Sequence, residues 1–314
     1  MSKSTMKFIG KRLIIAAITV VIILSILFLM LKLMPGTPFN DEKLSDTQKE
    51  AIYEAYGLNE PIIVQFFTYL KNMLTGDFGT SYGISRNYPV SSLVLPRISI
   101  SFGIGIAAVI LGTVIGFGLG IFAALHRNTF WDSFATVISV LGVSVPSFVI
   151  ALLLLLIFAV NLSVFPVLYN SSRVLMSSAL PIIALSFGVI ANVARFTRSE
   201  MISVLASDYI ALAEAKGLDK KTIIRKHAIR NTLIPVITIL GPILVNLMTG
   251  SMVLEQIFSI PGLGTLLVNG ISVNDYNVVL AVSFLYSLLY IVMMLIVDLS
   301  YGIIDPRIRL GKGE

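Results

Sequence analysis

The chain has 314 residues, of which 56% are hydrophobic and 13% are charged, and its formal net charge at pH 7 is +6. A soluble domain would carry about twice that share of charged residues, so the composition excludes an ordinary soluble enzyme. The absence of cysteine excludes disulfides and thiolate metal sites, and two histidines disfavour a histidine metal cluster. We therefore expect no metal and no cofactor. We also expect no nucleic-acid partner, because excess Lys and Arg in membrane proteins usually marks cytoplasmic loops.

The first apolar run covers residues 13–33 and follows a basic segment, residues 1–12. A cleaved signal peptide would have a shorter apolar core and a small-residue cleavage site, so we expect an uncleaved first span. Residues 36–97 then form a polar insert of mixed charge. The insert is either a surface cap packed on the spans or a docking surface for an outside partner, and the sequence leaves both open.

Within this insert, residues 46–56 and 61–74 have helical periodicity, and residues 76–83 are rich in turn-forming residues. The remaining spans are expected within residues 98–304, because apolar runs of about 20 residues cross a bilayer. Their predicted limits are 99–125, 132–160, 179–195, 233–254 and 278–304. The fold class is therefore an all-α polytopic membrane protein with six transmembrane helices, and residues 305–314 form a tail.

Two spans carry local signals. Gly112, Gly116 and Gly120 in the second span have the small-xxx-small spacing that lets helix backbones approach closely. Pro146 lies in the middle of the third span and is expected to kink it, either for packing or to shape a pathway. No span shows a polar stripe strong enough to identify residues that line a pathway.

Loop charge predicts the orientation. The short loops 161–177 and 255–277 contain only Arg173 as a basic residue, whereas the segments on the other side collect most of the Lys and Arg. Both termini are thus predicted to be cytoplasmic, with the insert outside. One acidic residue, Asp298, falls within the last span, and this shortage of charge is atypical of an ion-coupled transporter. Energy for uphill transport is expected from a partner.

Residues 200–231, between the fourth and fifth spans, form the longest polar segment of the carboxy-terminal half. It reads as two short helices joined by a hinge. Leu205, Tyr209, Leu212 and Ala213 recur at helical spacing and are expected to share one face. On pattern alone, an amphipathic hairpin held on anionic lipid by Lys and Arg is an open alternative.

The hinge of this segment has its own signals. Gly217 stands where a helix needs a left-handed residue in order to stop. Asp219 follows as an expected N-cap for a second, basic helix. Pro235 is expected within the first turn or so of the next apolar run, where its missing N–H costs least.

The segment resembles the cytoplasmic EAA loop of permease subunits of ABC importers, in the branch that imports oligopeptides, dipeptides and nickel. The resemblance rests on Asp208, Tyr209, Ile210, Ala213, Ala215, Lys216, Gly217, Leu218, His227, Ala228, Ile229, Arg230, Asn231, Leu233, Ile234 and Pro235. The general pattern has Glu six residues before the Gly, where this chain has Ala211, a departure that is normal for the peptide branch. Residues 34–36, 57–61, 76–81, 144–148, 255–264 and 305–307 also resemble the branch, and the long insert resembles its B-type permease.

The resemblance implies the type I ABC importer permease architecture in a bacterial plasma membrane. It implies a second homologous permease, two ATPase subunits carrying ATP and Mg, and an extracellular peptide-binding lipoprotein that delivers a peptide. The chain is not expected to be an enzyme itself, since it lacks the G-x-x-x-x-G-K-[ST] phosphate loop. Rival interpretations are the same machinery with a dipeptide, nickel-complex or signalling-peptide cargo, and a self-sufficient secondary transporter or channel.

The resemblance also implies site residues. The ATPase-coupling loop would use Asp208, Tyr209, Ala211, Ala213, Ala215, Gly217, His227, Arg230, Asn231 and Pro235. A short helix whose small-residue face contains Ala211, Ala213 and Ala215 is expected to enter a groove on the ATPase closely. A possible outer gate consists of Glu255, Phe258, Pro261, Gly262 and Gly264.

Overall fold

The computed structural model describes residues 3–33, 47, 50, 53–54 and 57–304. The chain divides into two compact units. Unit 1 comprises Met1–Ile100, Pro261–Val292 and Leu310–Glu314, and unit 2 comprises Ser101–Ile260 and Met293–Arg309. Within the described residues the regular structure is helical, apart from an isolated β-bridge between Thr80 and Pro89.

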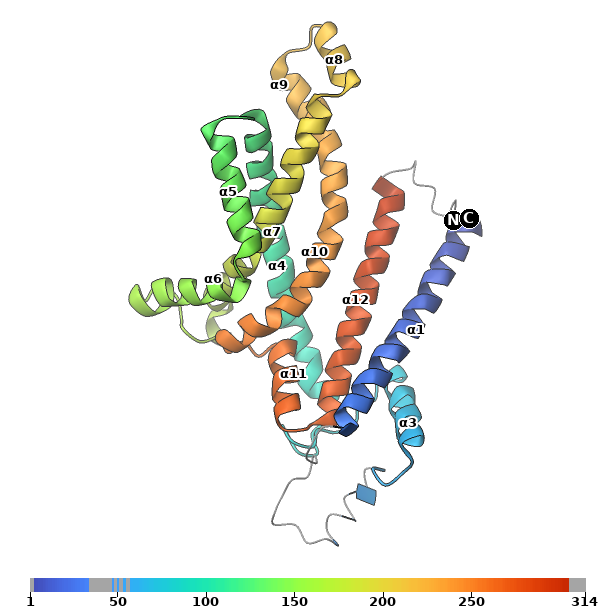
Figure 1. The fold of residues 1–314 in the computed structure, drawn as a ribbon. Coiled ribbons are helices and arrows are strands. Elements are labelled where there is room, and N and C mark those ends of the chain that lie inside the picture. The colour runs from blue at the N-terminus through green and yellow to red at the C-terminus, as the bar shows by residue number, and fades with distance from the viewer. Residues whose placement is uncertain (1–2, 34–46, 48–49, 51–52, 55–56, 305–314) are drawn as a thin grey trace. The chain divides into compact units, whose positions relative to one another are not determined.

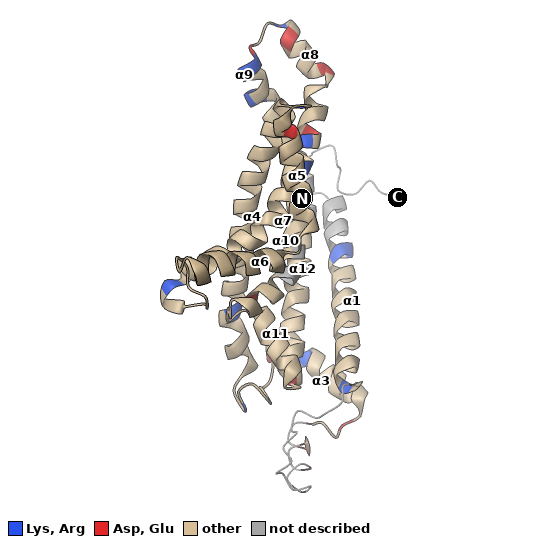
Figure 2. Cartoon of the chain, turned by 60° about the vertical axis from the view of Figure 1, so that its left-hand side comes forward, with Lys and Arg blue, Asp and Glu red and all other residues tan. Residues whose placement is uncertain are grey.

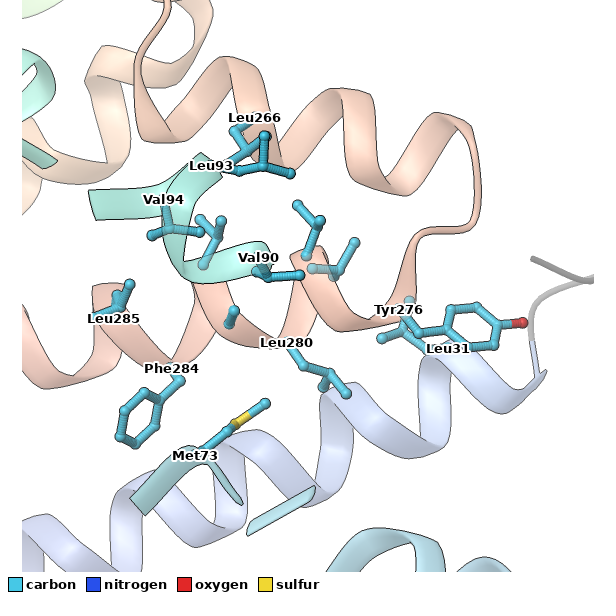
Figure 3. Packing of buried hydrophobic residues seen from close by; sticks show 14 of the residues in the cluster. Leu31, Met73, Val90, Leu93, Val94, Leu266, Tyr276, Leu280, Phe284 and Leu285 are labelled. Atoms are coloured by element: carbon cyan, nitrogen blue, oxygen red, sulfur yellow. The ribbon is translucent and has the colours of Figure 1, made fainter. Parts of the chain in front are cut away.

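Unit 1 is built from helices far apart in the sequence. They are α1 (Lys3–Leu33), α3 (Ile62–Leu74), the start of α4 (Val90–Leu125), α11 (Leu263–Ser272) and most of α12 (Tyr276–Ile304). Their apolar side chains meet in one core that includes Leu31, Met73, Val90, Leu280 and Phe284 (Figure 3). Helix α3 confirms the periodicity seen at residues 61–74, whereas residues 46–56 lie mostly outside the described part.

Asp275 fastens the turn-rich loop of unit 1 to the start of α12. One carboxylate oxygen of this fully buried residue accepts hydrogen bonds from the Ser81 hydroxyl at 2.5 Å and from the backbone N–H groups of Tyr82, Gly83 and Ile84 at 3.0–3.2 Å. The Asn277 amide adds a bond to the carbonyl of Thr80 at 2.8 Å. The loop is thus held by side chains almost 200 residues further along the chain.

Unit 2 is organised around a long central helix, α7 (Val174–Leu205). The other elements are α5 (Phe130–Ser144), α6 (Ser147–Leu154), η1 (Leu155–Asn161), η2 (Ser171–Arg173), α8 (Asp208–Ala215), α9 (Lys220–Thr222), η3 (Ile223–Ala228) and α10 (Ile229–Ile257), with the rest of α4. Helix α7 packs against α5, α6 and α10, which surround it in Figure 1.

The glycines of α4 form a close seam with α7. A Cβ atom added to Gly116 would lie 2.7 Å from the carbonyl oxygen of Ile190, and one on Gly120 would lie 2.6 Å from that of Ala194. Gly112 is equally tight, 2.5 Å from Val189 Cβ, whereas Gly118 has open space. The small-xxx-small prediction is confirmed, because only glycine lets these two backbones approach so closely.

The third predicted span is two helices. Among the described residues, five helices are long and apolar enough to cross a membrane, or six if α5 and the run from α6 to η1 count as one span. That pair is bent by 101° at Pro146, which confirms the kink predicted there, although the bend divides the segment into separate helices (Figure 1). Val145 adopts an extended backbone, as expected for a residue before proline, and this ends α5.

Other boundaries also differ from the predictions. Helix α4 begins at Val90, inside the residues 36–97 assigned to the insert. Helix α7 continues ten residues beyond the predicted end of the span at Arg195, to Leu205, and so includes Arg198. A helix, α11, occupies most of the segment expected as a polar loop before Asn277. Hydropathy locates apolar runs, but polar residues continue a helix when its backbone bonds are satisfied.

Candidate functional site

The segment between α7 and α10 folds as a hairpin, residues 206–228, at one end of unit 2 (Figure 1). It contains α8, a turn at Gly217, the single-turn helix α9 and the π-helical η3. The hinge at Gly217 and a helix on either side of it confirm the pattern expected from the sequence.

The turn is closed by bonds at the end of α8. Gly217 N–H donates to the carbonyl of Glu214 at 2.9 Å, and Leu218 N–H donates to that of Ala213 at 3.3 Å. This pair of bonds is the Schellman motif, which requires a left-handed residue, and Gly217 has φ +77°. No heavy atom lies within 4 Å of a Cβ built there, so it is the backbone conformation, and not lack of space, that favours glycine.

The second arm begins at Asp219, whose carboxylate accepts a hydrogen bond from the Thr222 N–H at 3.1 Å. Hydrogen bonding from Thr222 lowers the pKa of Asp219 below its ordinary value. The arm then continues through η3 into α10, so Pro235 lies inside α10 and the prediction that it sits in a first turn was wrong. The helical backbone starts earlier because the polar cap, and not the apolar run, initiates it.

The inner face of the hairpin joins its two arms. Ile210 and Ala213 of α8 pack against Ile223 of η3, and the exposed fraction of each is 5% or less. Leu205 ends α7, and Tyr209 and Leu212 are exposed while Ala213 is buried, so the expectation of one face shared by all four residues was wrong. The buried face is selected by Ile223, which lies beyond the turn. Ala213 therefore shapes the hairpin from inside.

The base of the hairpin is anchored to the long helices. Ala124 of α4, Met201 of α7 and Ala228 of η3 form one buried cluster. The buried Thr232 hydroxyl lies 2.9 Å from the carbonyl of Ala228 and 3.4 Å from the sulfur of Met201. The base of the hairpin is thus packed directly on α4 and α7.

The outer face of the hairpin combines exposed apolar side chains with charge. The exposed fractions of Tyr209, Leu212 and Leu218 are 43%, 56% and 39%. Ala211, Ala215, Asp208, Arg230 and Asn231 are exposed, whereas His227 is half-buried and its carbonyl accepts from the Asn231 amide at 2.7 Å. Charged residues lie along α8 and α9 (Figure 2). Apolar side chains within a charged rim are typical of a protein-binding surface.

The residues predicted as an outer gate fall in both units. In unit 2, Glu255 and Phe258 are buried, and Glu255 accepts a hydrogen bond from the Ser101 hydroxyl at 2.7 Å. The carbonyl of Phe258 accepts from the Tyr169 N–H at 2.9 Å. In unit 1, Gly262 precedes α11, Gly264 is buried and Pro261 is exposed. A gate formed by these residues stays a prediction.

Comparison with known proteins places the chain in a family. Residues 116–310 match the model of the binding-protein-dependent transport system inner membrane component, and residues 5–91 match the amino-terminal model of such membrane components. The chain belongs to this family. The permease is 44% identical over 304 residues to the dipeptide transport system permease protein DppB of Lactococcus lactis, covering 97% of this chain and 99% of the relative.

An oligopeptide permease and a solved transporter structure are also similar to this chain. The permease is 42% identical over 305 residues to the oligopeptide transport system permease protein OppB of Salmonella typhimurium, with coverage of 97% and 99%. Its fold is similar to a chain of the inward-facing MetNI methionine ABC transporter, with a TM-score of 0.58, 16% identity and coverage of 68% of this chain and 96% of that chain. The type I ABC importer permease fold expected from the sequence is confirmed.

Proposed function

We propose that this permease is the membrane-spanning subunit of an ATP-driven oligopeptide importer in a bacterial plasma membrane. The proposal is supported by sequence identities of 44% and 42%, over 97% of this chain, to permeases named for dipeptide and oligopeptide transport. A second homologous permease completes the pathway, and an extracellular binding lipoprotein delivers the peptide. ATP hydrolysis takes place on partner ATPases, and this chain is the translocation subunit.

The hairpin is the proposed docking site for one of two ATPases. The observation that carries this assignment is its two-sided construction, with Ile210, Ala213 and Ile223 packed inside and Tyr209 and Leu212 presented outside. A partner that contacts the outer face differently in two nucleotide states would bias the attached helices between two positions. The anchored base supplies the connection to α4 and α7.

Co-purification tests the assembly. The chain is tagged at its carboxy terminus in its native cell and extracted gently in detergent. Recovery of two ATPase chains and a second permease is the expected result. Recovery of the folded chain alone would refute the importer and favour a self-sufficient transporter.

Gly217 tests the role of the hairpin. A Gly217→Val variant should insert normally but lose peptide uptake driven by ATP hydrolysis, because a β-branched residue does not tolerate φ +77°. Gly217→Asn is the matched control, since Asn adopts the left-handed region more readily and should retain most uptake. Normal uptake by Gly217→Val would contradict the proposed role.

The proposed orientation puts both termini and the coupling loop, residues 200–231, in the cytoplasm and the insert outside. Loop charge supports it. Because the chain has no cysteine, single substitutions report cleanly. In intact cells or spheroplasts, a membrane-impermeant maleimide should label Arg86→Cys and leave Lys221→Cys unlabelled until the membrane is permeabilised. The reverse pattern would invert the topology.

A dipeptide is the second candidate cargo, and the 44% identity to a dipeptide permease favours considering it. Competition for uptake separates the two. Excess unlabelled tetrapeptide should block uptake of a labelled tetrapeptide much more strongly than excess dipeptide does. The opposite order would assign the permease to dipeptides.

A further inference from the structure

A cavity of about 560 Å³ lies between α7 and α10 in unit 2. Its described lining comprises Asn192, Arg195, Phe196, Ser199, Thr238, Ile239, Pro242 and Ile243. No site is predicted here from the sequence, because the fourth span is expected to end at Arg195. The helix in fact continues for ten residues beyond Arg195, to Leu205.

The cavity is bordered by a polar face of α7. Asn192, Arg195 and Ser199 follow one another at spacings of three and four residues, so they lie on the same side of the helix. Another side of α7 is packed against α4, where Val189, Val193 and Thr197 meet the glycine seam. Ala191 packs against Gly142 of α5 on a further side. The polar face is therefore the part of α7 that packing on α4 and α5 leaves uncovered.

Arg195 supplies an available positive charge. Its side chain is exposed, and it makes no hydrogen bond or ion pair within the described residues. The neighbouring Arg198 is different, because its guanidinium pairs with Asp132 of α5. No Asp or Glu is among the described residues that line the cavity. Ionisable side chains within membrane-spanning helices usually face a protein interior or a water-filled cavity.

A guanidinium beside amide and hydroxyl groups suits a carboxylate. Arginine donates a planar pair of N–H groups that matches the two carboxylate oxygens, and such bonds are about twice as strong as neutral ones. The apolar part of the lining, Phe196, Ile239 and Ile243, would contact the side chains of the same ligand. A peptide with a free carboxyl terminus combines both features.

We propose that this cavity is a binding site within the peptide pathway, where Arg195 holds the terminal carboxylate of the translocated peptide. The proposal rests on the peptide-import function proposed above. It identifies one end of the cargo by its charge and makes Arg195 a specificity-determining residue of the membrane subunit.

The test compares uptake of two labelled probes, tetraalanine and tetraalanine amide, by cells that contain the complete transporter. The ratio of the two uptake rates is measured for wild type, Arg195→Gln and Arg195→Lys. Because the binding protein is the same in all strains, its own preference cancels when the ratios are compared. Arg127→Gln removes an exposed positive charge from the α4–α5 turn, outside the cavity, and serves as the matched control.

The expected result is a fall of about tenfold in the carboxylate-to-amide ratio for Arg195→Gln, the size of one charge-assisted hydrogen bond. Arg195→Lys should keep part of the preference, and Arg127→Gln should keep all of it. An unchanged ratio in Arg195→Gln would overturn the inference. So would an equal loss for both probes, which is expected if Arg195 binds a lipid headgroup.

Assembly gives an independent readout. Arg195→Gln should still co-purify with the second permease and the ATPases, and loss of that association would overturn the inference in favour of a subunit contact. If wild-type cells take up neither probe although the complex is assembled, peptide import itself is refuted, together with this inference. If wild type takes up both and only the ratio fails to respond, peptide import stands and the site is wrong.

Discussion

The guanidinium of Arg198 forms a bidentate ion pair with the carboxylate of Asp132 and so joins α7 to α5 in unit 2. Nη2 of Arg198 lies 2.8 Å from one carboxylate oxygen, Nε donates to the other, and only 6% of the Asp132 side chain is exposed. The Asn128 N–H donates a further bond to Asp132 at 2.9 Å, which includes the α4–α5 turn in the same network.

This pair should be strongly coupled energetically. Asp132→Asn and Arg198→Gln should each lower the free energy of unfolding by about 1–3 kcal/mol, because each leaves a partly buried charge without its partner. The double variant should lose clearly less than the sum of the single losses. A double-mutant cycle on the thermal stability of the purified protein in detergent measures this, and additive losses would contradict the coupling.

The α4–α7 seam predicts unequal effects of two similar substitutions. Gly116→Ala should destabilise the protein by about 1–3 kcal/mol, because the new methyl group would meet the Ile190 carbonyl at 2.7 Å. Gly118→Ala should be neutral or slightly stabilising, since no heavy atom lies within 4 Å and alanine is the better helix former. Thermal unfolding of both variants compares them directly, and equal effects would rule out the seam as the cause.

Asp275 should control the order of the loop that it binds. Asp275→Ala removes the acceptor of four hydrogen bonds and should accelerate tryptic cleavage at the exposed Arg86 by about tenfold or more. Asp77→Ala removes only a local bond to the Gly79 N–H and should change the cleavage rate little. Limited proteolysis of the purified protein, followed by mass spectrometry, distinguishes the two. Similar rates in both variants would show that the loop is held by other contacts.

The two faces of α8 should respond differently to alanine. Leu212→Ala should leave thermal stability unchanged and weaken co-purification of the ATPases, because its side chain is 56% exposed on the outer face. Ile210→Ala should lower the free energy of opening the hairpin by about 2–4 kcal/mol, because it leaves a cavity between the two packed arms. Hydrogen exchange across residues 206–228 separates a lost contact surface from a loosened hairpin. Loss of protection in Leu212→Ala would contradict the assignment of faces.

The cap at Asp219 should make the second arm of the hairpin sensitive to acid. Its pKa is lower in the folded state, so the cap contributes stability above the ordinary pKa and loses it as pH falls through the folded value. Exchange of the Thr222 amide should therefore accelerate, relative to Asp219→Asn at the same pH, only below about pH 4. Asparagine keeps an acceptor oxygen that does not titrate. Identical profiles for the two proteins would exclude the carboxylate as the source.

The sequence predicted those features that depend on neighbours along the chain. Gly217 and Asp219 act within about one helical turn, so their local pattern was sufficient to assign them. The spacing of the α4 glycines predicted close helix packing but did not identify α7 as the partner. Helix ends were misplaced where polar residues continue a helix, as in α7 beyond Arg195. Apolar run length marks a span and does not mark the end of a helix.

Features that depend on distant partners could not be predicted. Ala213 is buried because Ile223 returns against it after the turn, which helical periodicity within α8 does not indicate. The carboxylate of Asp275 binds a loop that lies nearly 200 residues earlier in the chain. The cavity beside Arg195 forms only where α10 lies next to α7, and the sequence does not predict that these two helices are neighbours. The predicted end of the span at Arg195 also separated Ser199 from the other polar residues of the cavity.

The glycine seam also limits how unit 2 can deform. With no side chain to cushion the contact at Gly116 or Gly120, sliding α7 along α4 would drive backbone into backbone. Helices α4 and α7 are therefore expected to move together as one rigid unit within unit 2. With 32 residues, α7 alone is about 48 Å long. A tilt of about 10° imposed at one end would carry the other end about 8 Å. The close contacts at Gly112, Gly116 and Gly120 would thus transmit a displacement at one end of unit 2 along the length of α7.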